Sequence, residues 1–204
     1  MSTVKPRQVA LTDALLRIVA EHGLDQVSVR EVASAAGVSI GTVQHYFPTK
    51  DAMLAAAFTE VVRRIRVRVA AVEPGPDLRA NLSAVLRELL PLDARRADEV
   101  RIQLAFAARA ATAPALADIQ RGVLTEVMCE LAEAFSTAGG GGVAGGGGAG
   151  GGKPVEWSRS AARLALAATD GLALHAVSSG GWLSTSEQGA ALEHLLDALL
   201  AGAE

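Results

Sequence analysis

Two short helices joined by a tight turn constrain the fold of this chain more than any other feature. Ser28 and Glu31 form a capping box, in which the serine hydroxyl accepts a bond from a free backbone N–H. Gly37 can end that helix in a left-handed conformation, and Ser39 can cap the next one. Residues 28–46 are therefore predicted to form a helix, a sharp corner at AAGVS and a second helix.

Helix-favouring residues dominate the rest of the sequence. Alanine, leucine and arginine are frequent, and no stretch shows the sustained apolar and polar alternation of a strand. Glycine, proline and capping residues divide this pattern into segments, so we expect an all-α fold. The expected helices cover residues 6–22, 28–36, 39–46, 50–73, 77–90, 93–111, 114–137, 155–179 and 185–201.

The composition indicates a globular protein with a substantial core. Half of the residues are apolar and a fifth are charged, and no window of about 18 residues is free of charge, so no membrane span is expected. The N-terminus lacks the apolar region of a signal peptide. The single cysteine, Cys129, excludes an internal disulfide and is expected to be a small buried hydrophobe. These features predict a cytoplasmic protein.

Charge is distributed unevenly along the chain. Residues 1–68 carry nine Lys and Arg against six Asp and Glu, whereas residues 69–204 carry ten against sixteen. A basic N-terminal part on an acidic remainder is expected where only one end of a protein meets a polyanion. The arginine-rich run at 63–68 is interpreted as a solvated helix face.

The segment 139–152 contains 11 glycines among its 14 residues. Glycine loses the most backbone entropy when it is ordered, so this segment is predicted to be a flexible linker. A phosphate-binding loop is a poor alternative, because such loops need glycines at fixed offsets and a Lys with Ser or Thr at the start of a helix.

The helix at 39–46 is predicted to be amphipathic. With about 100° per residue, Val43, Phe47 and Ile40 fall on the flank that faces the core. The other side carries a small residue and polar side chains, namely Gly41, Thr42, Gln44 and His45. Core packing alone explains Val43 and Phe47, but not Gln44 and His45. We therefore expect this outer face to contact base edges or phosphates.

Together with the helix at 6–22, the pair has the helix-turn-helix arrangement, in which one helix braces and the next enters the major groove. Residues 8–54 closely resemble the DNA-binding region of TetR-family transcriptional repressors. The matching positions are Ala36-Gly37-Val38-Ser39, Gly41-Thr42, Tyr46-Phe47 and Lys50. The resemblance implies a DNA-binding domain over residues 1–50 and a ligand-binding and dimerisation domain over residues 51–204.

The resemblance also implies a role for individual residues in binding operator DNA. Tyr46, Lys50, Thr42 and Ser39 match phosphate contacts, and Gln44, Ile40, Gly41, His45 and Arg30 match positions that face the bases. Ser28 completes the predicted DNA-binding set. The Gln44-His45 pair departs from the usual family pattern, so no operator sequence is carried over.

The later part of the chain has a weaker resemblance. Residues 89–121 resemble the C-terminal domain of betaine-responsive repressors, which implies a pocket for a small-molecule inducer and dimerisation through the helices at 155–179 and 185–201. The function implied is that of a homodimeric repressor that releases its operator when the inducer binds. The candidate pocket residues are Gln103, Phe106, Arg109, Met128, Trp157, Asp170 and His175, each of which has core packing or solvent contact as an alternative.

Two other functions compete with this interpretation. An enzyme is disfavoured, because the four histidines lack metal-ligand spacing and the cysteine has no evident catalytic partner; no cofactor or metal is expected. A helical ligand-binding or scaffold protein without DNA binding is the second alternative, against which the intact capping box and Lys50 argue.

Overall fold

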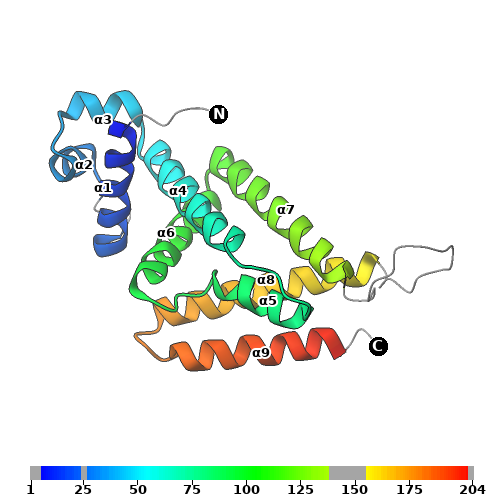
Figure 1. Cartoon of the computed structure of the whole chain (residues 1–204). Helices are drawn as coiled ribbons and strands as arrows, with labels where there is room; N and C mark the ends of the chain where they lie inside the picture. Colours follow the sequence, from blue (N-terminus) through cyan, green and yellow to red (C-terminus); the bar gives the residue numbers. More distant parts are fainter. Residues whose placement is uncertain (1–5, 24–26, 138–154, 202–204) are drawn as a thin grey trace. The chain divides into compact units, whose positions relative to one another are not determined.

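The computed structural model describes residues 6–23, 27–137 and 155–201, and the regular structure in these ranges is entirely helical (Figure 1). Each expected helix is present, with ends that agree to within one helical turn, whereas the glycine-rich segment lies outside the described residues. The helices are α1 (Pro6–His22), α2 (Val29–Ala36), α3 (Ile40–Tyr46), α4 (Lys50–Ala70), α5 (Leu78–Arg87), α6 (Ala94–Ala110), α7 (Pro114–Ser136), α8 (Val155–Ser178) and α9 (Thr185–Ala201).

The chain divides into two compact units that do not follow its order. One unit consists of residues 1–67 and 91–120, and the other of residues 68–90 and 121–204. The first unit therefore holds α1–α3, most of α4, α6 and the start of α7. The boundary at residue 50 stays a functional prediction, because α4 and α6 pack in the same unit as the first three helices.

An apolar core joins the helices of the first unit. Phe58 of α4 and Phe106 of α6 stack with ring centroids 3.9 Å apart, and both are buried. The helix α1 packs against α2 and α6. It contributes the fully buried Leu11 and Leu15, whereas Val9 is 47% exposed.

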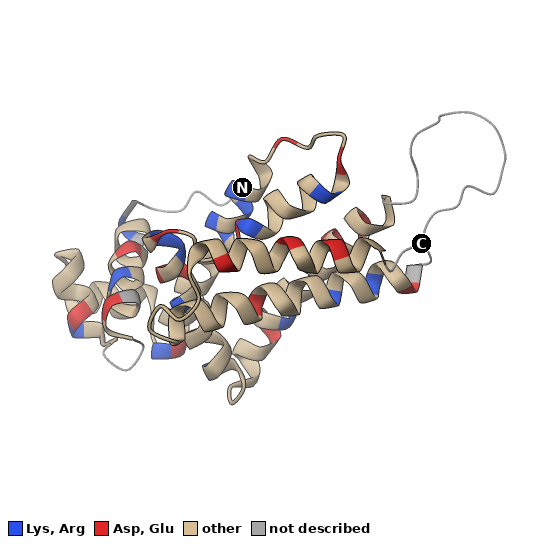
Figure 2. Ribbon diagram, turned by 90° about the horizontal axis from the view of Figure 1, so that it is seen from below, with Lys and Arg blue, Asp and Glu red and all other residues tan. Residues whose placement is uncertain are grey.

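The second unit is built around α5, α8 and α9. The helix α9 buries Leu192 and Leu196 within the chain and packs against both other helices. Arg79 and Arg87 of α5 form ion pairs with Glu193 of α9 at 2.9 and 3.5 Å. Figure 2 shows that acidic and basic residues are spread along the helices.

Some of the small residues of α8 are buried within the chain, and others lie on its surface. Ala161, Ala162 and Ala165 are buried, whereas Ala167 and the larger Leu164 are exposed. The buried alanines let α8 pack closely within the single chain. None of the described helices is long and apolar enough to span a membrane.

Candidate nucleic-acid interface

Capping residues define both ends of α2 and the start of α3. Ser28 Oγ accepts the backbone N–H of Glu31 at 3.2 Å and donates to the Glu31 carboxylate at 2.9 Å. Gly37 adopts a φ of 65°, a left-handed conformation that other residues reach only at a cost. Ser39 Oγ then accepts the N–H of Thr42 at 3.2 Å and starts α3. The predicted caps are therefore confirmed.

The inner face of α3 is anchored to the core. Val43 is fully buried and Phe47 is 3% exposed, as predicted from the helical periodicity. Ile40 was expected on the same flank, but its side chain is 45% exposed. Ile40 is the first residue of α3, one turn before Val43, and there the helix extends past the edge of the core. This exposure places Ile40 with the surface residues of α3.

The outer face of α3 is open and polar. Gly41, Gln44 and His45 are exposed, and Thr42 and Tyr46 are half-buried. A Cβ atom added to Gly41 would meet only Ser39 Oγ, at 3.9 Å, so the fold itself does not require glycine there. Because Gly41 has no side chain, the surface of α3 is recessed there, beside the longer side chains of Gln44 and His45.

Aromatic and hydroxyl side chains border this face. The rings of His45 and Tyr46 meet edge to face with centroids 5.2 Å apart, which restricts their orientation. Ser39 Oγ and Thr42 Oγ1 lie 2.9 Å apart in a shared hydrogen bond. Predicted phosphate contacts thus lie beside predicted base contacts on one short helix.

The start of α4 carries another predicted DNA contact, Lys50, which is exposed, as is Arg30 on α2. Thr49 Oγ1 accepts the N–H of Ala52 at 3.0 Å and caps α4. The neighbouring Asp51 forms a two-pronged ion pair with Arg109 of α6, with N–O distances of 2.8 and 2.9 Å. These bonds from Arg109 lower the pKa of the Asp51 carboxyl group and raise that of the guanidinium.

The ligand candidates fall into both units. In the first unit, Phe106 is fully buried and belongs to the aromatic core, Gln103 is half-buried, and Arg109 is bound to Asp51. Arg109 is predicted from the sequence to line a pocket, but its ion pair with Asp51 has no local sequence signal, because the two residues lie 58 positions apart.

The four other candidates lie in the second unit. Met128 is half-buried, and Trp157 packs edge to face on Phe135 at 5.8 Å. His175 is exposed and meets Trp182 at 6.5 Å. Solvent reaches Asp170, but the surrounding protein desolvates its carboxyl group and raises the pKa to about 6. These residues stay candidates for a ligand site. Cys129 is exposed, so its predicted burial is wrong: it lies on the outer side of α7.

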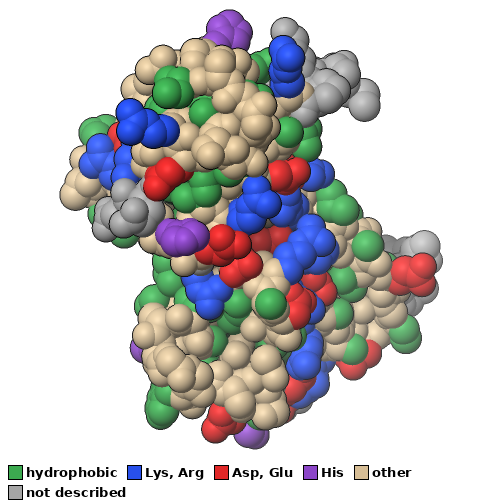
Figure 3. Space-filling view, turned by 90° about the vertical axis from the view of Figure 1, so that its left-hand side faces the viewer, with side chains coloured by type: hydrophobic (Ala, Val, Ile, Leu, Met, Phe, Trp, Pro, Cys, Tyr) green, Lys and Arg blue, Asp and Glu red, His purple; other side chains and the backbone are tan. Residues whose placement is uncertain are grey.

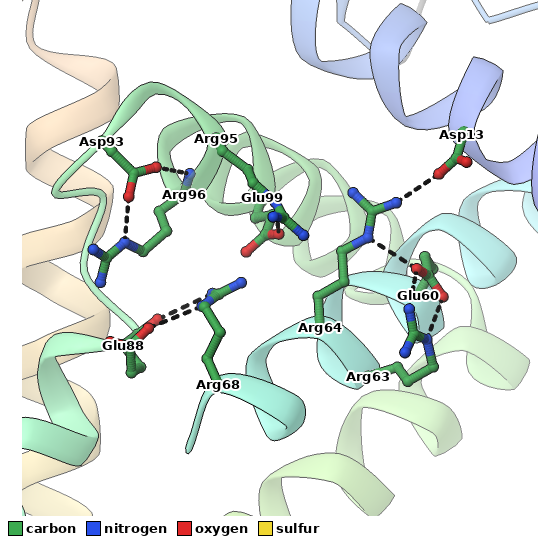
Figure 4. A network of polar contacts seen from close by, with 10 residues as sticks. All are labelled: Asp13, Glu60, Arg63, Arg64, Arg68, Glu88, Asp93, Arg95, Arg96 and Glu99. Atoms are coloured by element: carbon green, nitrogen blue, oxygen red, sulfur yellow. Dashed lines mark hydrogen bonds and ion pairs between the residues drawn. The ribbon is translucent and has the colours of Figure 1, made fainter. Parts of the chain in front are cut away.

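A charged cleft of about 220 Å³ lies within the first unit, between α1, α4 and α6. Figure 3 shows acidic and basic side chains intermixed on that face of the molecule. Arg64 binds Asp13 of α1 at 2.6 Å and Glu60 of its own helix at 2.9 Å, as Figure 4 shows. Glu99 of α6 has a buried side chain and an ion pair with Arg95 at 3.6 Å.

The run at 63–68 is therefore more than the solvated face expected from the sequence. Arg64 keeps only 21% of its side chain exposed because it bridges α1 and α4. Arg68 pairs with Glu88 at 2.9 Å in the second unit. No cluster of His, Cys, Asp and Glu that could hold a metal ion occurs in the part of the chain that the structure describes.

A capped two-helix corner, an anchored short helix and an exposed polar face define a DNA-binding protein of the helix-turn-helix class. Comparison with known proteins gives the family. Residues 11–57 match the bacterial regulatory proteins of the tetR family, and residues 74–201 match the C-terminal domain of BetI-type transcriptional repressors. The chain belongs to the TetR family of transcriptional regulators.

Individual relatives agree with this assignment. The regulator BetI of Burkholderia cenocepacia is 30% identical over 200 residues, which cover 96% of this chain and 94% of BetI. The alignments with PksA of Bacillus subtilis and BetI of Rhizobium meliloti span about half of each relative (51% and 50%).

Solved structures share the fold. A transcriptional regulator from Rhodococcus sp. Rha1 superimposes with a TM-score of 0.83 and 39% identity, over 96% of this chain and 97% of that one. A regulator from Saccharomonospora viridis, solved in complex with choline, gives a TM-score of 0.79 at 20% identity and covers 93% of this chain and 95% of its own.

Proposed function

We propose that this regulator is a homodimeric repressor that binds operator DNA through α3 in the cytoplasm and releases it when a small-molecule inducer binds. One observation carries the proposal: α3 buries Val43 and Phe47 while it exposes Gln44, His45 and Gly41. Polar side chains with amide and imidazole groups on an exposed recognition helix suit the donor and acceptor pattern of the major groove. The proposal includes no catalytic step.

Residue roles within this proposal follow the two kinds of DNA contact. Gln44, His45, Gly41, Ile40 and Arg30 face the bases, of which Gln44 has the amide group that suits adenine. Phosphate contacts come from the remaining predicted residues, namely Ser28, Ser39, Thr42, Tyr46 and Lys50. Alanine at Lys50 should therefore weaken binding to all sequences and reduce the salt dependence of binding by about one unit.

Two copies of the chain are part of the proposal because one recognition helix of this length reads only a few base pairs. The exposed Leu164 and Leu174 on α8, at 57% and 40%, support an apolar contact with a second copy through α8 and α9. Leu164→Asp should convert the dimer to a monomer in sedimentation experiments at micromolar concentration and abolish operator binding. A wild-type chain that sediments as a monomer would refute the dimer.

Release by a ligand requires that the ligand favour the state of the dimer that does not bind DNA. The side chains proposed to bind it are Gln103, Met128, Trp157, Asp170 and His175. Phe106 is fully buried and Arg109 is bound to Asp51, so these two candidates are less available to a ligand. Choline, which was found in the S. viridis relative, is the first compound to test.

Fluorescence anisotropy with a labelled fragment from upstream of the regulator's own gene tests DNA binding and release together. Binding that exceeds binding to random DNA, and that falls when one compound of a ligand panel is added, supports the proposal. Ligand binding without any DNA binding would favour the alternative, a helical ligand-binding or scaffold protein.

A further inference from the structure

The ion pair between Asp51 and Arg109 links α4 and α6 within one compact unit. Arg109 Nε and Nη2 donate to the two carboxylate oxygens of Asp51 at 2.8 and 2.9 Å. Arg109 Nη1 also donates to Thr112 Oγ1 at 3.3 Å. Because three guanidinium nitrogens form hydrogen bonds, the arginine is held in one orientation. Its two bonds to the carboxylate restrict the orientation of Asp51 more than a single bond would.

The location of Asp51 connects this ion pair to DNA binding. Asp51 directly follows Lys50, the proposed phosphate contact, in the first turn of α4. Only Pro48 and Thr49 separate α4 from Phe47, the residue that anchors α3 in the core. A movement of the first turn of α4 would therefore shift the Lys50 ammonium group relative to the recognition helix.

The same location makes two roles for the ion pair distinguishable. If Arg109 only neutralises a carboxylate that would otherwise repel phosphate, removal of that carboxylate should strengthen DNA binding. If the pair holds the first turn of α4 in place, removal of either partner should weaken binding, although loss of Asp51 makes the surface more positive. The two-pronged geometry and the third bond to Thr112 favour the second role.

We propose that Arg109 is a positioning residue for operator binding, which acts by holding Asp51 and thereby the phosphate-binding Lys50. This inference rests on the proposed function, because it assumes that the chain binds an operator. It assigns Arg109 to the DNA-binding machinery instead of the ligand site expected from the sequence.

Asp51→Asn and Arg109→Gln test this role in fluorescence anisotropy titrations on operator DNA. We expect each variant to bind the operator roughly two- to fivefold more weakly, because both residues are partly exposed and such pairs contribute modestly. Tighter or unchanged binding by Asp51→Asn would overturn the proposal. A wild-type chain that binds no DNA would refute the proposed function itself.

A double-mutant cycle tests whether the effect passes through Lys50. In a Lys50→Ala background, Arg109→Gln should cause little further loss, and both variants should reduce the slope of affinity against salt in the same direction. Fully additive losses would overturn the positioning role. Arg101→Gln is the matched control, because Arg101 lies on the same helix and forms a similarly exposed pair with Asp98 at 2.6 Å. It should bind like the wild type.

A charge exchange separates positioning from general loss of stability. The Asp51→Arg and Arg109→Asp double variant restores an ion pair in the reverse direction, so it should recover part of the affinity lost by either single variant. Melting curves identify variants that are unfolded at the assay temperature. No recovery in a folded double variant would contradict the proposal.

Discussion

Alanine substitutions at two adjacent residues of α3 should affect different properties, namely stability at Val43 and DNA binding at Gln44. Val43 is fully buried, and Val43→Ala removes two methyl groups, for which lost burial and the cavity left behind together cost about 2 kcal/mol of unfolding free energy. Gln44 is exposed, so Gln44→Ala should change the unfolding free energy by less than about 0.5 kcal/mol. It should instead cost about 1–3 kcal/mol of binding free energy on the operator.

Urea unfolding followed by circular dichroism measures the first effect, and anisotropy titrations on operator and random duplexes measure the second. Gln44→Ala should lose affinity for the operator alone, with the loss confined to one base pair in a set of operator variants. Equal losses on operator and random DNA would refute base reading by Gln44. An unchanged unfolding free energy for Val43→Ala would refute the assigned orientation of α3.

Four further predictions concern single sites. Gly37→Ala should lower the unfolding free energy by about 1–2 kcal/mol in thermal unfolding, because Gly37 has a φ of 65°. Gly41→Ala should leave stability nearly unchanged, since its Cβ meets no close neighbour in the chain, and should weaken operator binding. Ser184→Ala should cost about 1 kcal/mol, because the serine hydroxyl caps α9 by accepting the N–H of Glu187 at 3.3 Å. Desolvation by the surrounding protein raises the pKa of the partly exposed Asp170 carboxyl group from 3.8 to about 6. Its stabilising contribution is therefore complete below pH 3.8 and is lost as the pH rises through 6. Asp170→Asn should flatten the pH dependence of the unfolding free energy in this range.

Local signals explain why the helices and their corner were predictable. Ser28, Gly37 and Ser39 act on backbone groups within a few residues, so the sequence contains both partners of each interaction. The helical period likewise placed Val43 and Phe47 in the core. It failed for Ile40, because the period gives a direction around the helix and not the point along it where the core ends.

Interactions between distant segments account for what the sequence did not reveal. Arg109 pairs with Asp51 across 58 positions and Arg64 with Asp13 across 51 positions, and no local pattern indicates either of these pairs. Several acidic residues of the sequence could pair with each guanidinium, and the packing of α1, α4 and α6 determines which distant one it meets. For the same reason Arg109 is predicted from the sequence to belong to a ligand site: it is a polar residue on an otherwise aliphatic helix, and its distant partner Asp51 is not evident from the sequence.

Recovery of genomic DNA fragments by the purified chain tests the central claim most directly. The regulator proposed here should enrich a small number of fragments that share two inverted half-sites, and Gln44→Ala should lose that enrichment while its fold is retained. Uniform recovery of all fragments, or none at all from a folded wild-type protein, would contradict recognition of an operator by α3.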